Sequence, residues 1–162
     1  FVFNMNEVFF KKICGKYATG VTVITSKKNK IDYGFTANSF TSVSINPLLV
    51  LFCLDINSSS NKALKIGDYF VINILSEFQS IVCEKFSNNN LNHSERFNDL
   101  ETKNSPNNIK IISNSICWLE CKTIKFLKAG DHNIYLGEVM DGKIINNLKP
   151  LVYQEGEIKK II

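Results

Sequence analysis

Short runs of apolar and β-branched residues recur along the whole sequence, and turn residues separate them. Thr19–Ser26 reads TGVTVITS, and the polar turn Lys27–Lys30 divides it from the next run. Runs of this length and composition are typical of β-strands joined by short turns. Strands are predicted at residues 19–26, 31–40, 48–54, 69–75, 109–112, 117–127, 132–140 and 150–153. So many short strands favour a mostly β fold, a closed β-barrel with peripheral helices.

Three segments have the pattern of short helices. Helices are predicted at residues 5–14, 62–66 and 77–86. Apolar residues recur at helical spacing in the first. Gly67 would end the second, and Ser76 would cap the third. The polar, asparagine-rich residues 88–108 indicate a long surface excursion with a helical turn near Arg96, and loops of this length often cover an active site.

The length and composition exclude several classes of protein. A chain of 162 residues is enough for one domain with a real core, so residues 1–162 are expected to form a single domain. No apolar run is long enough to span a membrane, and no secretory signal is visible, so a cytoplasmic protein is expected. The net charge of +4 comes almost wholly from scattered lysines. Without a dense basic block, nucleic-acid binding is not indicated.

The cysteines and histidines give no pattern of a metal site. The five cysteines include no CxxC pair, and the chain has only two histidines. A zinc site needs such residues clustered at short spacing, so no metal is expected and the cysteines are interpreted as reduced thiols. Motifs for a Rossmann fold, a P-loop, a GxSxG hydrolase and an HExxH metalloprotease are also absent.

A polar segment, Gly34–Ser44, lies between two strongly apolar strand-like runs. It carries hydroxyl and amide side chains where the flanking strands should bury the backbone. Buried polar groups need partners. A polar ligand would supply them, and so would a strand edge whose hydroxyls bond only to the protein and to water.

Three further features suggest a polar ligand, each with a structural alternative. Ser58, Ser59 and Ser60 precede Lys62 at a predicted helix start and could bind a phosphate, although capping needs only one serine. His132 follows a turn at a strand entrance, where an imidazole could bond a planar ring or simply face solvent.

Asn73 lies inside an apolar strand and needs a partner if it is buried. A ligand heteroatom or a neighbouring backbone group would serve, and the backbone explanation is the commoner one.

These segments together resemble the flavin reductase-like family, which has an FMN-binding split barrel and includes the reductase components of two-component flavin monooxygenases. The resemblance is nearly full-length. It rests on GKYATGVTVIT (15–25), TANSFTSVS (36–44), Pro47, VINILS (71–76), Arg96-Phe97, AGDH (129–132), GEV (137–139) and PLVY (150–153).

The resemblance implies an NAD(P)H-dependent flavin reductase that transfers hydride from nicotinamide to FMN, with FAD also possible, and supplies reduced flavin to a partner monooxygenase. It also implies a homodimer with each flavin near the subunit interface. His132 would meet the nicotinamide and Tyr153 would lie near the nucleotide. The implied flavin contacts are Thr36, Ala37, Asn38, Ser39, Ser42, Val43, Cys53 and Leu54, with Ser58, Ser59, Ser60 and Lys62 at the phosphate.

Two other functions remain open at this point. One is a flavoprotein that holds FMN for storage, sensing or electron relay without nicotinamide turnover. The other is a split-barrel protein for pyridoxal phosphate or haem, in which His132 or His93 would be the available axial ligand. The segment 88–108 has no glycine where many relatives contain one, so the choice between NADH and NADPH stays open.

Overall fold

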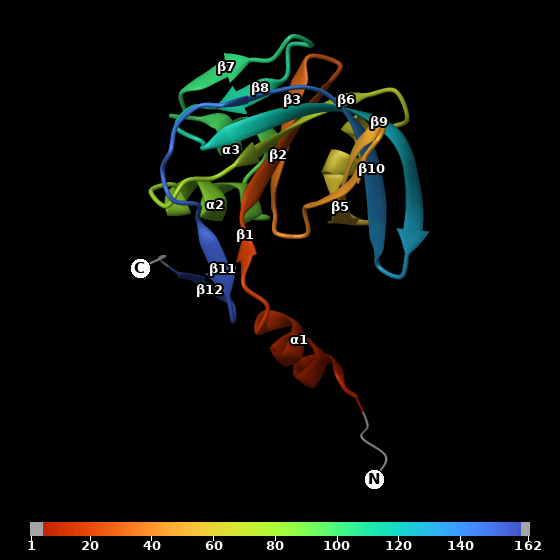
Figure 1. Cartoon of the computed structure of the whole chain (residues 1–162), viewed down its shortest axis with the longest axis vertical. Coiled ribbons are helices and arrows are strands. Elements are labelled where there is room, and N and C mark those ends of the chain that lie inside the picture. The colour runs from red at the N-terminus through yellow and green to blue at the C-terminus, as the bar shows by residue number, and fades with distance from the viewer. Residues whose placement is uncertain (1–4, 160–162) are drawn as a thin grey trace.

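The computed structural model describes residues 5–159. Its main feature is a seven-stranded antiparallel sheet, shown in Figure 1. The strands are β2 (Thr22–Lys28), β3 (Ile31–Ala37), β4 (Thr41–Ile45), β5 (Leu48–Asp55), β6 (Tyr69–Ile74), β9 (Cys117–Ala129) and β10 (His132–Ile144). They pair in the order β3-β2-β6-β9-β10-β5-β4, and the mostly β fold is confirmed.

The sheet is not closed into a barrel, and that part of the prediction is wrong. Its two edge strands, β3 and β4, follow each other in sequence but share no ladder. The chain leaves the sheet after Ala37 and rejoins it at Thr41 on the opposite edge. The polar segment that links them therefore runs across the open side of a strongly curved sheet (Figure 1).

Aromatic side chains fill the concave side of the sheet. Phe52 packs against Phe70 edge-on and against Tyr135 in a stacked arrangement, each with ring centroids 5.3 Å apart. All three side chains are almost completely buried. Burial of such large apolar surfaces is the main stabilising contribution to a domain of this size.

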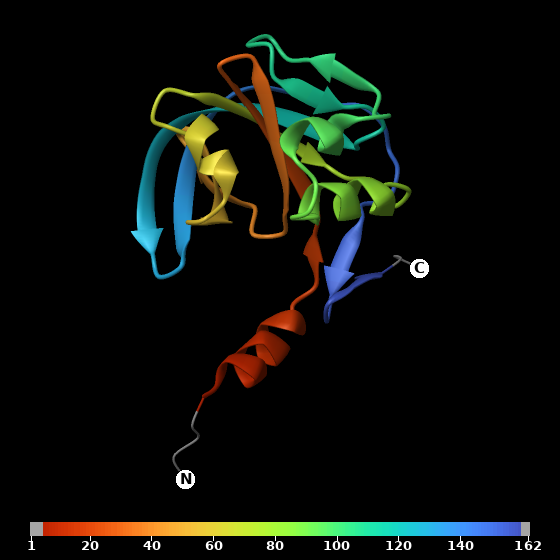
Figure 2. The ribbon, with the colours of Figure 1, turned by 180° about the vertical axis from the view of Figure 1, so that it is seen from behind.

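Two helices flank the edge strand β3. They are α2 (Ser80–Ser87) and α3 (His93–Phe97), and Figure 2 shows them beside β2 and β3. A Cβ on Gly34 of β3 would lie 2.4 Å from the ring of Phe86 and 3.2 Å from that of Phe97. The absence of a side chain at Gly34 therefore lets both aromatic rings pack directly on the strand.

Smaller elements complete the described chain. They are α1 (Glu7–Gly15), the 3-10 helix η1 (Ser59–Ala63), β1 (Thr19–Gly20), β11 (Val152–Gln154), β12 (Glu157–Lys159), β7 (Thr102–Asn104) and β8 (Lys110–Ile112). β1, β11 and β12 form a small sheet, and β7 pairs with β8. No helix among residues 5–159 is both long and apolar enough to cross a membrane.

Several element predictions need correction. The helix predicted at 62–66 is a single 3-10 turn that begins earlier, at Ser59. The helix predicted from residue 77 begins at Ser80, because Ser76 is held in an isolated bridge to Pro150. The short strands β4, β7 and β12 were not predicted, since three to five residues without clear alternation carry too little signal.

Asn73 illustrates how a buried polar residue is satisfied by the fold. It is completely buried, and its amide nitrogen donates to the carbonyl of Val23 at 3.0 Å and contacts the Thr25 hydroxyl at 3.3 Å. Its oxygen accepts the backbone N–H of Ile112 at 2.8 Å. The backbone explanation is confirmed, and Asn73 is a structural residue that ties β2, β6 and β8 together.

Candidate functional site

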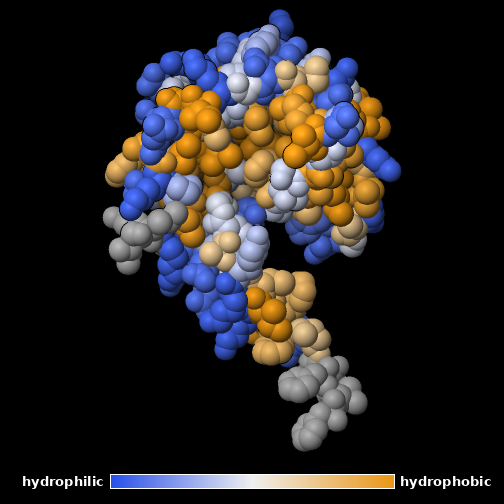
Figure 3. Space-filling model, in the orientation of Figure 1, coloured by the Kyte–Doolittle hydropathy of each residue, from blue (hydrophilic) through white to orange (hydrophobic). Residues whose placement is uncertain are grey.

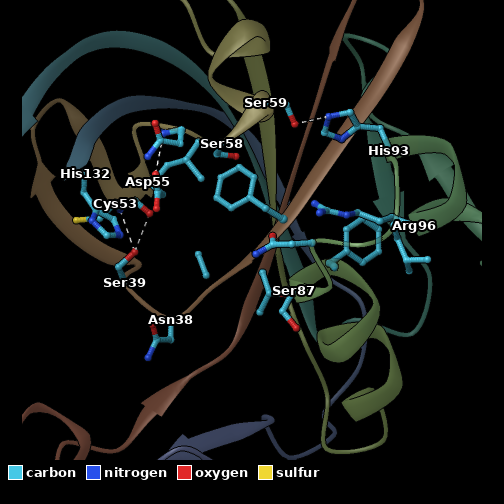
Figure 4. Close-up of a pocket in the computed structure, with 18 of the residues that line it drawn as sticks. Asn38, Ser39, Cys53, Asp55, Ser58, Ser59, Ser87, His93, Arg96 and His132 are labelled. Carbon is cyan, nitrogen blue, oxygen red and sulfur yellow. Dashed lines mark hydrogen bonds between the residues drawn. The ribbon is translucent and has the colours of Figure 1, made fainter. Parts of the chain in front are cut away.

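A cavity of about 790 Å³ lies between the end of β3, the end of β5, η1 and the two helices α2 and α3. Figure 4 shows its labelled side chains converging from these elements. The lining residues are Phe35, Thr36, Ala37, Asn38, Ser39, Cys53, Leu54, Asp55, Asn57, Ser58, Ser59, Phe86, Ser87, Asn89, Leu91, Asn92, His93, Arg96 and His132. Nine of the predicted site residues are therefore brought together in one place, out of the fourteen named from the sequence.

The hydroxyls of the polar segment are largely used by the protein itself. Thr36 donates its hydroxyl to the carbonyl of Cys83 on α2 at 2.7 Å. Ser39 accepts the backbone N–H of Cys53 at 2.9 Å and donates to the Cys53 carbonyl at 3.3 Å. Asn38, by contrast, is exposed. This wall thus presents Asn38 and backbone groups to a ligand, with Thr36 and Ser39 holding the backbone in place.

His132 lies at the start of β10, on the same side of the cavity as Ser39 and Cys53 in Figure 4. It is paired across the ladder with Asp55 of β5. Its Nδ1 lies 2.8 Å from Oδ1 of Asp131, and this contact with His132 lowers the pKa of the Asp131 carboxyl. A carboxylate only accepts, so Nδ1 carries the hydrogen and Nε2 is left for another partner.

Of the four residues predicted to bind the phosphate, two line the cavity and two do not. Ser58 and Ser59 line the cavity, and the Ser58 side chain caps η1 by accepting the backbone N–H of Ser60 at 3.3 Å. Ser60 is completely buried and does not line the cavity. Lys62 is exposed outside it. Because η1 is a five-residue 3-10 helix, the argument from an α-helix N-terminus does not apply.

Besides Ser60 and Lys62, three more predicted residues do not line this cavity. Ser42 and Val43 are exposed on the edge strand β4, and for them a contact with flavin stays a prediction. Tyr153 lines a second cavity of about 680 Å³ beside α1. Asn38 lines both cavities, so Tyr153 lies next to the site without entering it.

Two basic side chains of α3 line the cavity but were not among the predicted site residues. Arg96 is only 9% exposed and donates to the carbonyls of Gly34 at 2.7 Å and Asn88 at 3.0 Å. Its Nε is buried without a hydrogen-bond partner in the described structure, and burial lowers the pKa of the guanidinium. The signal available in the sequence was that Arg96 is the sole arginine of the chain.

His93 is the second of these residues. Its Nε2 lies 2.8 Å from the hydroxyl of Ser59, and its ring packs 4.3 Å from that of Tyr33. Burial, followed by the charges of Arg96 and Lys62, lowers the pKa of His93. The imidazole is therefore neutral near pH 7. Among residues 5–159, no group of three or more His, Cys, Asp or Glu could hold a metal ion.

The sequence matches a family of enzymes over most of its length. Residues 14–161 match the model of the flavin reductase like domain. The FMN reductase (NADH) SmoA of Agrobacterium fabrum is 33% identical over 83% of this chain and 75% of its own length. The reductase subunit HsaB of a flavin-dependent monooxygenase from Rhodococcus jostii is 30% identical over 91% of this chain and 74% of its own.

A solved structure agrees with this match. The NADH:FAD oxidoreductase SgcE6 of Streptomyces globisporus, in complex with NAD and FAD fragments, superposes with a TM-score of 0.90 at 26% identity. The match covers 97% of this chain and 93% of that one. From the family model, the sequence relatives and the shared fold together, the chain belongs to the flavin reductase-like family.

Proposed function

We propose that this protein is an NAD(P)H:flavin oxidoreductase that transfers hydride from a dihydronicotinamide to FMN, or to FAD. The observation that carries the proposal is that one cavity is lined by the backbone wall at Thr36–Ser39, by His132, and by Ser58 and Ser59. Relatives named as FMN and FAD reductases support it. We further propose that residues 1–162 act as one such domain, in the cytoplasm, where NAD(P)H is available.

The described residues fit a flavin nucleotide. The cavity volume of about 790 Å³ lies within the roughly 300–1,000 Å³ typical of small-molecule sites. β3 is an edge strand, so backbone groups on its outer side have no neighbouring strand and suit the hydrogen-bonding edge of an isoalloxazine. The guanidinium of Arg96, whose buried Nε has no hydrogen-bond partner among the described residues, adds a positive charge that suits an anionic ligand.

Each wall of the cavity then has a distinct task. Thr36, Ala37, Asn38 and Ser39 would hold the flavin ring, with Cys53 and Leu54 of β5 beside it. Ser58 and Ser59 would bind its phosphate, with the charge of Lys62 nearby. Ser60 is completely buried, and its hydroxyl has no hydrogen-bond partner among the described residues, so a contact of Ser60 with the phosphate stays a prediction.

Little acid–base help is required from the protein. A bound flavin supplies the hydride-accepting atom, its N5. The side chains bring the two rings to reacting distance and exclude water. His132 would orient the nicotinamide through Nε2, since Asp131 occupies Nδ1. The arrangement needs no nucleophile or carboxylate pair.

We infer that the reduced flavin is passed to a partner monooxygenase. The inference rests on relatives named as reductase subunits of flavin-dependent monooxygenases. We also propose a homodimer. Helix α1 has no buried residue, yet Val8 is 77%, Phe10 57% and Ile13 47% exposed. A helix with so much exposed apolar surface needs a partner surface.

The test is steady-state oxidation of NADH and of NADPH by the purified protein with FMN, FAD or riboflavin. The proposal predicts flavin-dependent oxidation with at least one nicotinamide. No oxidation in any combination contradicts it. A protein that retains FMN through purification and still oxidises neither nicotinamide would instead be the flavoprotein for storage or electron relay.

A further inference from the structure

One end of the cavity is closed by a contact between α3 and η1. The hydroxyl of Ser59 lies 2.8 Å from Nε2 of His93, the dashed line at the upper right of Figure 4. The tilted ring of Tyr33, 4.3 Å away, packs against the imidazole and holds it. The proposed hydride transfer makes no use of His93, so this contact needs its own explanation.

The charges around this contact favour an anion. Arg96 and Lys62 both lie close enough to His93 to lower its pKa, after the larger effect of burial. The acidic residue among the lining residues named above is Asp55, whose Oδ1 accepts the backbone N–H of Asn57 at 2.7 Å. The Ser59 hydroxyl is therefore bonded to an imidazole that lies in the positive field of Arg96 and Lys62.

The tautomer of the neutral imidazole determines the direction of the Ser59 O–H bond. Nδ1 of His93 is buried and has no hydrogen-bond partner among the described residues. If the ring hydrogen is on Nε2, it donates to the Ser59 oxygen and the serine hydrogen is free to turn into the cavity. If it is on Nδ1, the serine must donate to Nε2 and offers the cavity only lone pairs. A phosphate oxygen, which only accepts, selects the first arrangement.

We propose that His93 is a positioning residue that turns the hydroxyl of Ser59 toward the phosphate of a flavin nucleotide, so that this end of the cavity selects phosphorylated flavins over riboflavin. The inference rests on the proposed function, which supplies flavin as the ligand. FMN and FAD both carry a phosphate next to the ribityl chain, so the shared chemistry is that phosphate group.

The test compares flavin binding, measured by quenching of flavin fluorescence without any nicotinamide. His93→Leu keeps a side chain beside Tyr33 but removes the donor, His93→Gln restores an N–H, and Ser59→Ala removes the hydroxyl. Loss of a hydrogen bond to a charged group should weaken FMN binding about tenfold in the Leu and Ala variants. Riboflavin binding should be almost unchanged, and His93→Gln should recover most of the FMN affinity.

Two comparisons make the test specific. The double variant Ser59→Ala/His93→Leu should bind FMN no more weakly than Ser59→Ala, because His93 acts through Ser59. Lys103→Ala, a loss of charge at an exposed position of β7, is the matched control and should leave FMN binding unchanged. A loss for FAD equal to that for FMN assigns the subsite to any ribityl phosphate, and a loss for FMN alone assigns it to the monoester.

Two results would overturn the inference about His93. If His93→Leu weakens riboflavin as much as FMN, the residue only maintains the shape of the cavity and the inference is overturned. Unchanged FMN binding in both single variants overturns it as well. Failure of the unmodified protein to bind any flavin is a different result, because it removes the proposed function itself.

Discussion

At the scale of single residues, the imidazole of His132 is the group closest to the proposed chemistry. Its Nδ1 is committed to Asp131, which fixes Nε2 as the atom that can meet a nicotinamide. Replacing His132 with Ala should slow hydride transfer by about tenfold to a hundredfold through loss of orientation. Flavin affinity should change much less, because the ring-binding wall is on β3.

Rapid mixing of the flavin-loaded protein with NADH, together with a flavin titration, separates the two effects. Asp131→Asn is the matched variant: it keeps the side-chain size but removes the charge from an exposed carboxylate. An unchanged rate of reduction in His132→Ala would remove His132 from the site.

The cysteines differ in a way that a thiol reagent can detect. Burial, with a smaller effect of Glu120, raises the pKa of Cys121 to about 12, and burial also raises the pKa of Cys83. The thiolate is the reactive form, so at pH 8 both should stay unmodified until the protein unfolds. Cys14 is exposed and should react first.

Cys53 makes the same experiment a test of the site, because it lines the cavity. FMN should slow its alkylation and leave that of Cys14 unchanged, as followed by mass spectrometry of the peptides. Equal rates at Cys53 with and without FMN would place the flavin elsewhere.

The chemistry of single residues was partly readable from the sequence. Ser58, Ser59 and His132 were identified as candidate ligand contacts from their types and positions, and all three line the cavity. His93 and Arg96 were not predicted as flavin contacts, because their place in the site depends on contacts with Ser59 and Gly34, more than thirty positions away. No local pattern encodes a pairing over that separation.

At the scale of elements, the packing of α2 and α3 on β3 forms one wall of the cavity. Gly34→Ala would place a Cβ 2.4 Å from the Phe86 ring and force the helix outward. Overpacking of this kind should reduce the free energy of unfolding by about 1–3 kcal/mol. Flavin binding should weaken with it, because Phe86 also lines the cavity.

Denaturant unfolding measures the change in stability. Gly20→Ala is the matched control, since no atom lies within 4 Å of a Cβ at that position. If Gly34→Ala proved as stable as Gly20→Ala, the helices would not be fixed by contact at this glycine.

The long elements were predicted well and the short ones poorly, for a physical reason. β2, β5, β6, β9 and β10 carry enough apolar or β-branched residues to be recognised alone. η1 was placed too late in the chain because its first turn is polar and is held by Ser58 capping rather than by apolar periodicity. The sequence could not show that β3 and β4 remain unpaired edges of the sheet, because barrel closure depends on which strands meet in space.

At the scale of the whole molecule, helix α1 exposes apolar side chains and buries none of its residues. Figure 3 shows its apolar side chains at the surface, away from the main body. We expect the protein to be a dimer and Phe10→Asp to shift it toward monomer, because a charge would be buried in the interface. Light scattering after size-exclusion chromatography measures the mass directly.

Lys12→Asp, on the same helix, is the matched control and should remain dimeric if the apolar side chains make the contact. A monomeric unmodified protein at micromolar concentration would contradict the dimer.

We propose that flavin occupies the cavity between β3, β5 and α3. A crystal structure of the protein grown with excess FMN tests it most directly. We expect the isoalloxazine against residues 36–39 with His132 near its open face, and the phosphate beside Ser58 and Ser59. An empty cavity, or FMN bound at another surface, would contradict it.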